Sequence, residues 1–371
     1  MIRVLIVDDS LTSRELLRGI LESDPEIRVV GVAASGAEVI AMVERSPPHV
    51  VVMDINMPGM NGYEATQRIL ERHPLPIVIC SAAWQSEEAV NSLRAIDAGA
   101  VTALPKPQGP GSPNYQKLAS RFIRLVKAMA EVRVICRRAV VQTPSQVKTL
   151  PASDCHVDLS SVSLPFSSLS LEISELCARR RGGVDIVAIG ASTGGPPVIK
   201  AILGGLDRSL SVPVIIVQHI ADGFLMAMTQ WLENELARPV RIASDREKLE
   251  GGVVYFAPDQ FHLGVRQGVV VLDGHTPPKH GLRPSVSHLF RSLAAHYRER
   301  AVGILLTGMG RDGAEALKLM RDQGALTIAQ DQESSLVFGM PGEAIKMGAA
   351  QLVLSPERII ATLNSLLARG G

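Results

Sequence analysis

Residues 185–195 read DIVAIGASTGG, and this stretch decides how the C-terminal half of the chain folds. An apolar run leads into a glycine-rich turn with Ser192 at its centre, and a helical pattern follows from Pro196. Strand, turn and helix in this order raise a hydroxyl above the end of a sheet, and the turn satisfies the G-x-S-x-G nucleophile-elbow pattern. The six turn residues alone leave two other interpretations open. Ser192 is a helix N-cap in one, and in the other it replaces the glycine of a dinucleotide-binding turn that admits the pyrophosphate.

The composition of the chain bounds its class. A length of 371 residues favours two or three domains. The net charge of +1, from 38 basic and 37 acidic residues, gives no electrostatic case for nucleic acid or an anionic membrane surface. Every apolar run is too short to span a bilayer, the early Asp8 and Asp9 argue against a secretory signal, and the four cysteines form no C-x-x-C pair. We therefore expect a cytoplasmic protein that binds no nucleic acid and is not itself a membrane protein.

The first third of the chain alternates apolar runs with helical patterns. Strands are predicted at residues 4–7, 28–32, 50–53, 77–80 and 101–104. Five strands with helices between them indicate a parallel, doubly wound α/β sheet. The first helix is expected to begin at Thr12 with a capping box that includes Glu15, and the last covers residues 113–131 with one apolar stripe.

Polar residues follow the predicted strands where each strand ends. They are Asp8, Asp9, Asp54, Ser81 and Lys106. Ligands bind such sheets beyond the carboxyl ends of the strands. Three carboxylates at one edge repel each other unless a cation compensates them, and hard oxygen ligands suit Mg²⁺. The group could therefore bind Mg²⁺ and accept a phosphoryl group on one carboxylate, the alternative being exposed acidic loops of no special function.

Three segments of this region resemble the signature of a response-regulator receiver domain: LIVDDS at 5–10, MDINMPGMNG at 53–62 and PKP at 105–107. The resemblance implies a flavodoxin-like fold that receives phosphate from a histidine kinase on Asp54. It further implies a Mg²⁺ site formed by Asp8, Asp9, Asp54 and the backbone carbonyl of Asn56. Ser81 and Lys106 match the positions that contact the phosphate. The aromatic switch residue of the family falls on Ala103, which puts the usual aromatic switch in doubt.

The pattern breaks down after residue 132 and restarts near residue 183. A serine-rich segment at 162–170 indicates that residues 133–182 form a linker between a receiver domain at 1–132 and a second domain at 183–371. Strands of the second domain are predicted at 185–189, 214–217, 253–256, 269–272, 302–306 and 326–329. Glycines in the middle group indicate a small antiparallel excursion within a Rossmann-like α/β domain.

Two further polar residues follow strands of the second domain. His219 ends the run PVIIVQH at 213–219, and Asp312 follows a strand and a glycine turn in LLTGMGRDG at 305–313. With Ser192 they supply a nucleophile, a base and an orienting carboxylate, and parallel strands can bring all three into one crevice. The order Ser-His-Asp differs from that of α/β-hydrolases. A core histidine at 219, an N-cap at 312 and His262 as a rival base are the alternatives.

The segments 190–195, 218–219 and 306–313 strongly resemble the catalytic domain of bacterial chemotaxis protein-glutamate methylesterases, as does RPSV at 283–286. The resemblance implies Ser192 as nucleophile, His219 as general base and acid, Asp312 as orienting carboxylate and the Met309 N–H as oxyanion donor. It departs at Ser287, where an acidic residue is often seen.

The combined resemblances imply a phosphorylation-activated serine esterase. Its substrates would be glutamate γ-methyl esters and glutamines on the cytoplasmic helices of chemoreceptors, and the catalytic domain would need no cofactor. Two alternatives come from other classes: a receiver-controlled binding module with an inactive esterase-like domain, and a nucleotide-dependent enzyme. All three triad residues are present, which argues against the first. Nothing about twenty residues beyond the turn supplies the ribose-binding acid that the second requires.

Overall fold

A computed structural model describes residues 1–81, 87–112, 115–132, 183–208, 210–236 and 238–368. The predicted linker at 133–182 lies outside these residues. Two α/β parts are present, and each is described by itself. Among the described residues, every helix is too short or too polar to cross a bilayer.

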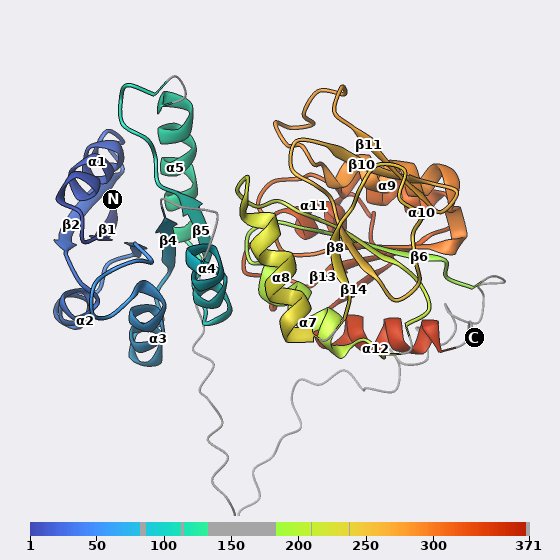
Figure 1. Cartoon of the computed structure of the whole chain (residues 1–371), viewed down its shortest axis with the longest axis horizontal. Helices are drawn as coiled ribbons and strands as arrows, with labels where there is room; N and C mark the ends of the chain where they lie inside the picture. The colour runs from blue at the N-terminus through green and yellow to red at the C-terminus, as the bar shows by residue number, and fades with distance from the viewer. Residues whose placement is uncertain (82–86, 113–114, 133–182, 209, 237, 369–371) are drawn as a thin grey trace, which may run out of the picture. The chain divides into compact units, whose positions relative to one another are not determined.

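The N-terminal part is a five-stranded parallel sheet with the order β2-β1-β3-β4-β5 (Figure 1). Its elements are β1 (Ile2–Val7), α1 (Leu11–Glu22), β2 (Ile27–Ala33), α2 (Gly36–Arg45), β3 (Val50–Met53), α3 (Gly62–Arg72), β4 (Ile77–Ser81), α4 (Glu87–Asp97), β5 (Thr102–Pro105) and α5 (Tyr115–Ala130). Helices α1 and α5 contact each other, as do α2, α3 and α4 in sequence. All five predicted strands and the predicted last helix are confirmed.

The central strands of this sheet explain its core. All four residues of β3 are buried, as expected for a strand covered on both faces, which carries a continuous apolar run. Phe122, Val126 and Met129 form the buried stripe of α5. The first helix begins at Leu11, close to the predicted start near Thr12, but its N-cap lies two residues before the predicted capping box. Ser10 caps α1, and its hydroxyl accepts from the Ser13 N–H, because an N-cap oxygen satisfies a donor of the first turn.

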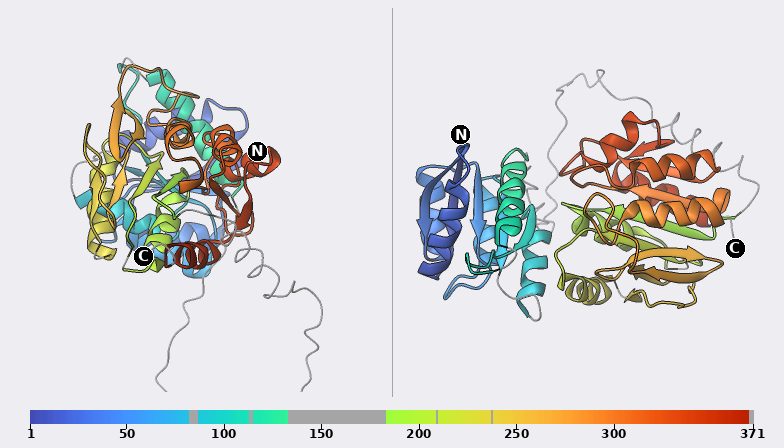
Figure 2. Two further views of the ribbon diagram at one scale, coloured as in Figure 1. Left: turned by 90° about the vertical axis from the view of Figure 1, so that its right-hand side faces the viewer. Right: turned by 90° about the horizontal axis from the view of Figure 1, so that it is seen from above.

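The C-terminal part is a seven-stranded parallel sheet with the order β14-β13-β12-β6-β7-β9-β8. Its strands are β6 (Ile186–Ala191), β7 (Val214–Gln218), β8 (Val240–Ile242), β9 (Val254–Phe256), β12 (Ala301–Leu305), β13 (Leu326–Gln330) and β14 (Leu352–Leu354). Its helices are α7 (Gly195–Gly205), α8 (Phe224–Leu236), α9 (Val286–His296), η1 (Arg298–Arg300), α10 (Ala314–Asp322), α11 (Met340–Lys346) and α12 (Pro356–Leu367). Helix α7 contacts α8 and α12, and α10 contacts α9 and α11, so helices cover both faces (Figure 2).

A separate hairpin of β10 (His262–Arg266) and β11 (Val269–Asp273) supplies the antiparallel element. The prediction of an antiparallel excursion is confirmed, but the strand predicted at 253–256 belongs to the main sheet as β9, where it pairs in parallel with β7. Strands β8, β10 and β14 were not predicted. Two of them, β8 and β14, have only three residues each, which is too short for alternation to be recognised in sequence.

The chain reverses direction across the C-terminal sheet at β6. It leaves β6 toward β7 on one side and later returns to β12 on the other side. Such a switch point opens a crevice at the carboxyl ends of the strands. Ser192 follows β6, His219 follows β7 and residues 306–312 follow β12, so all three segments meet at this edge.

Candidate active site and candidate phosphorylation site

The turn after β6 holds Ser192 by its backbone. The Ser192 N–H donates to the Thr307 carbonyl at 3.0 Å, and the Gly195 N–H donates to the Ser192 carbonyl at 2.8 Å. Helix α7 is capped by Gly194, whose φ of 78° lies in the left-handed region that glycine tolerates best. The interpretation of Ser192 as an N-cap was therefore wrong, and its hydroxyl is available for another role.

The first glycine of the elbow is required by packing. A Cβ atom at Gly190 would lie 2.3 Å from Cγ1 of Val286, the first residue of α9. Helix α9 therefore lies so close to the end of β6 that only glycine fits at position 190. This approach matters for the site, because the start of α9 also holds the candidate carboxylate Asp312.

His219 lies beside the nucleophile turn. Its N–H donates to the Ala191 carbonyl at 2.9 Å, which continues the β6–β7 pairing one residue past the end of β7. Ser192 thus directly follows β6, His219 directly follows β7, and these two strands are neighbours in the sheet.

Asp312 completes the arrangement from the loop after β12. Its carboxylate is 2% exposed, and Oδ2 lies 3.1 Å from Nε2 of His219, at ion-pair distance. Oδ2 also accepts from the Val286 N–H at 2.7 Å, while Oδ1 accepts from the Ser285 hydroxyl at 2.9 Å and the Ser287 N–H at 3.2 Å. The carboxylate therefore binds the first turn of α9, and it is not the N-cap of α10, which is Gly313.

The pKa of Asp312 reflects two opposed effects. Burial alone would raise the pKa of the carboxyl, but the contacts with His219, Ser287 and Ser285 outweigh it and hold the pKa well below its ordinary value. Asp312 is therefore ionised at neutral pH. A buried carboxylate beside an imidazole fixes the ring and stabilises the imidazolium when it forms.

The structure does not join all three residues by hydrogen bonds. Within the described part of the chain, the Ser192 hydroxyl donates to no acceptor, including His219. Catalytic hydrogen bonds are often absent or loose before substrate binds. The arrangement thus provides an orienting pair, His219 and Asp312, with an unengaged hydroxyl on the neighbouring strand end.

The rival histidine lies in a different environment. His262 is 1% exposed, its ring stacks on His288 with centroids 4.8 Å apart, and its Nε2 lies 3.2 Å from the Pro277 carbonyl. His262 is the first residue of β10, and its ring packs against α9 through His288. His262 is therefore a core histidine, which is the role that the sequence left open for His219.

Met309 lies close to the nucleophile through its neighbour Gly308. A Cβ atom at Gly308 would lie 2.7 Å from Cβ of Ser192, so only glycine allows this approach. The Met309 N–H has no acceptor among the described residues, and the side chain is 43% exposed. An unsatisfied N–H next to a candidate nucleophile is what an oxyanion hole requires.

The sequence did not predict the contacts of three buried residues of the site, which are Thr307, Gln330 and Ser285. Thr307 donates its N–H to Gln330 Oε1 at 2.8 Å and its hydroxyl to the Thr193 carbonyl at 3.0 Å. Ser285 binds Asp312 as described. Of these, Gln330 could have been recognised in the sequence, because it is a polar residue at the end of a buried strand. It ends β13, just as Gln218 ends β7.

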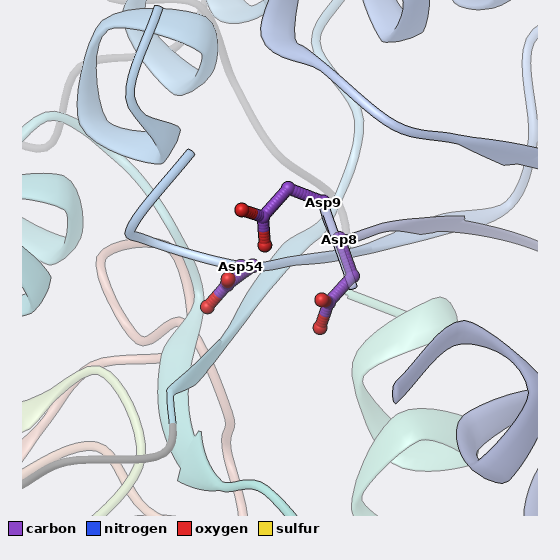
Figure 3. A group of neighbouring side chains, drawn as sticks. All are labelled: Asp8, Asp9 and Asp54. Carbon is purple, nitrogen blue, oxygen red and sulfur yellow. The ribbon is translucent and has the colours of Figure 1, made fainter. Parts of the chain in front are cut away.

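The N-terminal sheet carries a second group of polar side chains at its carboxyl edge. Asp8, Asp9 and Asp54 offer carboxylate oxygens that lie within 4.8 Å of one another (Figure 3). Lys106 Nζ lies 2.7 Å from Asp8 Oδ2 and 3.0 Å from Asp54 Oδ2. The set of three close carboxylates fits the oxygen-rich coordination of Mg²⁺, and Lys106 compensates part of their charge.

Burial changes the proton affinity of one of these carboxylates. Asp54 is 5% exposed, and burial raises its pKa from 3.8 to about 6, with Asp8 adding to the effect and Lys106 opposing it. A cation at this edge would favour the charged form.

The remaining predicted residues of this region lie on the same edge. Ser81 is buried at the end of β4, and its carbonyl accepts from the Lys106 N–H at 2.9 Å. Asn56 follows β3 by three residues and is exposed. Ala103 lies within β5, where it pairs with Ile79 of β4.

Comparisons with known proteins match two separate parts of the chain to two families. Residues 4–112 match the response regulator receiver domain family, and residues 187–363 match the CheB methylesterase family. Protein-glutamate methylesterase/protein-glutamine glutaminase 4 of Geobacter metallireducens is 48% identical over 367 residues, covering 99% of each chain. Protein-glutamate methylesterase/protein-glutamine glutaminase 1 of Syntrophus aciditrophicus is 45% identical, covering 99% of this chain and 98% of its own.

A solved structure of one part is also similar. The Thermotoga maritima CheB methylesterase catalytic domain is 35% identical, covers 48% of this chain and 98% of its own, and has a TM-score of 0.46. The fold and the matched families define the class: a response regulator whose receiver domain precedes an α/β output domain. The chain belongs to the protein-glutamate methylesterase/protein-glutamine glutaminase family.

Proposed function

We propose that this protein hydrolyses glutamate γ-methyl esters on chemoreceptors and deamidates receptor glutamines, with Ser192 as the nucleophile. The proposal rests on full-length relatives that carry both activities in their names and on the contact between His219 and Asp312 beside Ser192. In this proposal the substrates are the cytoplasmic helices of the receptors, so the enzyme would act in the cytoplasm. The observation that carries the chemistry is the buried, ionised Asp312 at 3.1 Å from the His219 ring.

The reaction follows from the proposed roles. Ser192 Oγ attacks the ester carbonyl while His219 takes its proton, and the Met309 N–H donates to the oxyanion. His219 then returns the proton to the leaving group, which departs as methanol. Water attacks the acyl-enzyme with His219 again as the base, releasing the glutamate side chain and Ser192. A glutamine reacts by the same steps and releases ammonia. Its amide nitrogen is a poorer leaving group than the methoxy oxygen of the ester.

The receiver domain would control this activity through Asp54. In this proposal a histidine kinase donates a phosphoryl group to the Asp54 carboxylate, and Lys106 and Ser81 contact the phosphate. Asp8, Asp9, Asp54 and the Asn56 carbonyl would hold Mg²⁺, which supplies positive charge against the phosphoryl oxygens when bound. The support is the group of three carboxylates and its Lys106 partner.

The proposed boundaries are a receiver domain at 1–132, a linker at 133–182 and a catalytic domain at 183–371. The two family matches, at 4–112 and 187–363, lie within the first and third of these.

The decisive experiment is hydrolysis of receptor membranes that carry labelled methyl esters, with and without a small phosphodonor and Mg²⁺. We expect labelled methanol to appear and to increase with the phosphodonor. A fluorophosphonate serine probe applied in parallel should modify Ser192. Membranes that keep their label while the probe modifies Ser192 would show a serine hydrolase with a different substrate.

A further inference from the structure

Gln218 occupies an unusual position between the nucleophile and the base. It is the last residue of β7, directly before His219, and it is 5% exposed. Its side chain turns toward the neighbouring strand, where its Nε2 donates to the Ser192 carbonyl at 2.8 Å and to the His219 carbonyl at 2.9 Å. One amide group thus joins the backbones of the two residues that must exchange a proton.

The chemistry of the side chain suits this task. A primary amide has two N–H donors on one nitrogen, and here each finds one carbonyl. A serine, threonine or histidine has a single donor at one atom, and a charged lysine would add an unpaired charge to a buried site. The amide therefore fixes the relative position of the Ser192 and His219 backbones in a way few other residues could reproduce.

The surrounding chain is shaped to accept this amide. A Cβ atom at Gly195 would lie 2.1 Å from Gln218 Oε1 and 2.9 Å from Cβ of Ala191. Gly194 is required by its left-handed φ, but Gly195 has no such φ. Gly195 is required because a Cβ atom there would clash with the Gln218 side chain. The same Gly195 N–H donates to the Ser192 carbonyl, so that carbonyl receives two hydrogen bonds, one from each side of the turn.

We propose that Gln218 is a positioning residue that sets the geometry between Ser192 and His219, and that Gly195 is the glycine that makes room for it. This inference rests on the proposed roles of Ser192 and His219. Gln218 does not touch the reacting atoms in this proposal. It acts through the two backbones, and small displacements of a nucleophile from its base are costly, about 100-fold for a shift near 1 Å.

The first test replaces Gln218 by methionine, which has similar length and no donor. The full chain is assayed with phosphodonor and Mg²⁺ on methyl-labelled receptor membranes, and the concentration of active enzyme is taken from titration of Ser192 with the fluorophosphonate probe. We expect kcat and the rate constant for probe labelling to fall about 10- to 100-fold, with KM nearly unchanged. Gln351→Met is the matched control, because Gln351 also makes a side-chain to backbone hydrogen bond, to the Thr327 N–H, but at the opposite end of β13.

The second test is a double-mutant cycle of Gly195→Ala and Gln218→Ala, which does not depend on the folding of the methionine variant. Gly195→Ala should displace the amide and lower kcat to a similar extent. Gln218→Ala removes the nearest clashing atom and leaves only the 2.9 Å approach to Cβ of Ala191. Gly195→Ala should therefore cost clearly less in that background than in the wild type. Independent, multiplying losses would overturn the inference. So would a folded Gln218→Met variant with wild-type kcat and labelling rate.

The outcomes separate this inference from the function on which it rests. A wild-type protein that is not labelled at Ser192 contradicts the proposed catalytic function. A wild-type protein that is labelled, together with variants at Gln218 that are labelled equally fast, contradicts only the positioning role.

Discussion

Nε2 of His219 and Oδ2 of Asp312 lie 3.1 Å apart, although the two residues follow different strands of the C-terminal sheet. The carboxylate in this pair is also held by three donors from residues 285–287, two of them backbone N–H groups of α9. Helix N-termini stabilise negative charge. Asp312 is thus held by the start of α9 on one side and faces the imidazole of His219 on the other.

Ser192→Ala should abolish methanol release without unfolding the protein, because only the hydroxyl is lost. Removal of a serine nucleophile costs a factor of about 10⁶ in turnover in serine hydrolases. His219→Ala should be nearly as severe. His262→Ala serves as the control, since the His262 ring stacks on His288 and the histidine beside Asp312 is His219. The measurement is single-turnover hydrolysis of methyl-labelled receptors. If His262→Ala were the inactive variant, the base would be misassigned.

Asp312→Asn should lower both activity and stability. The amide nitrogen would replace one of the two carboxylate oxygens and would face the N–H of either Val286 or Ser287 in place of an acceptor. Leaving a buried donor unsatisfied costs about 1–3 kcal/mol. The wrong tautomer of His219 would reduce kcat by about 10⁴. Urea unfolding and kcat are measured on the same preparation. Ser285→Ala removes one donor to Asp312 but leaves the acceptor in place, so it should be the milder change. Equal effects of the two substitutions would contradict this account.

The stability of the N-terminal domain should depend on pH through Asp54. Its pKa in the folded state, about 6, lies above the ordinary value of 3.8, so the folded domain binds the proton more tightly than the unfolded chain. The free energy of unfolding should therefore fall as pH rises from about 4 to about 6, by about 3 kcal/mol. Asp54→Asn should remove this dependence and stabilise the domain at pH 7.5. Hydrogen exchange of the β1–β5 amides without Mg²⁺ measures it, and exposed Glu64→Gln is the control.

Phosphate from a small phosphodonor should be found on Asp54 alone, and only with Mg²⁺. Asp8 and Asp9 belong to the same carboxylate group, but their proposed task is to hold the cation. Peptide mass spectrometry after borohydride trapping locates the aspartyl phosphate. Asp54→Asn and a sample with chelator are the controls. Phosphate on another residue of the wild type would contradict the assignment.

A fragment comprising residues 183–371 should be active without any phosphodonor. An esterase that is always open would remove receptor methyl groups regardless of signal, and we expect the unphosphorylated receiver domain to restrain it. Shifting a closed state from about 99% to about 1% requires roughly 5.5 kcal/mol of differential stabilisation. Methanol release by the fragment is compared with that of the full chain, with and without phosphodonor. A folded fragment no more active than the unphosphorylated chain would show that the receiver assists the catalytic domain and does not occlude it.

The sequence determined the local structure around each candidate residue. Apolar runs predicted eleven strands that the structure contains in full or in large part, ten in the two parallel sheets and β11 in the hairpin. Buried parallel strands need continuous apolar residues, which makes them recognisable in sequence. Polar residues directly after those runs, such as Asp8, Asp54, Ser192 and His219, pointed to the two carboxyl edges. The sequence placed these residues correctly since the position of a residue after a strand is a local property.

Tertiary structure decided which polar residues meet. The local pattern favoured His219, which ends an apolar run, but it left His262 as a rival. The strand order decides between them, because it puts His219 beside β6 and leaves His262 on a separate hairpin. The attachment of Asp312 to the start of α9 and the span of Gln218 to the Ser192 carbonyl join segments distant in sequence. Such contacts depend on side-chain directions and on spaces left by glycines, which exist only once the sheet has closed and its helices have packed.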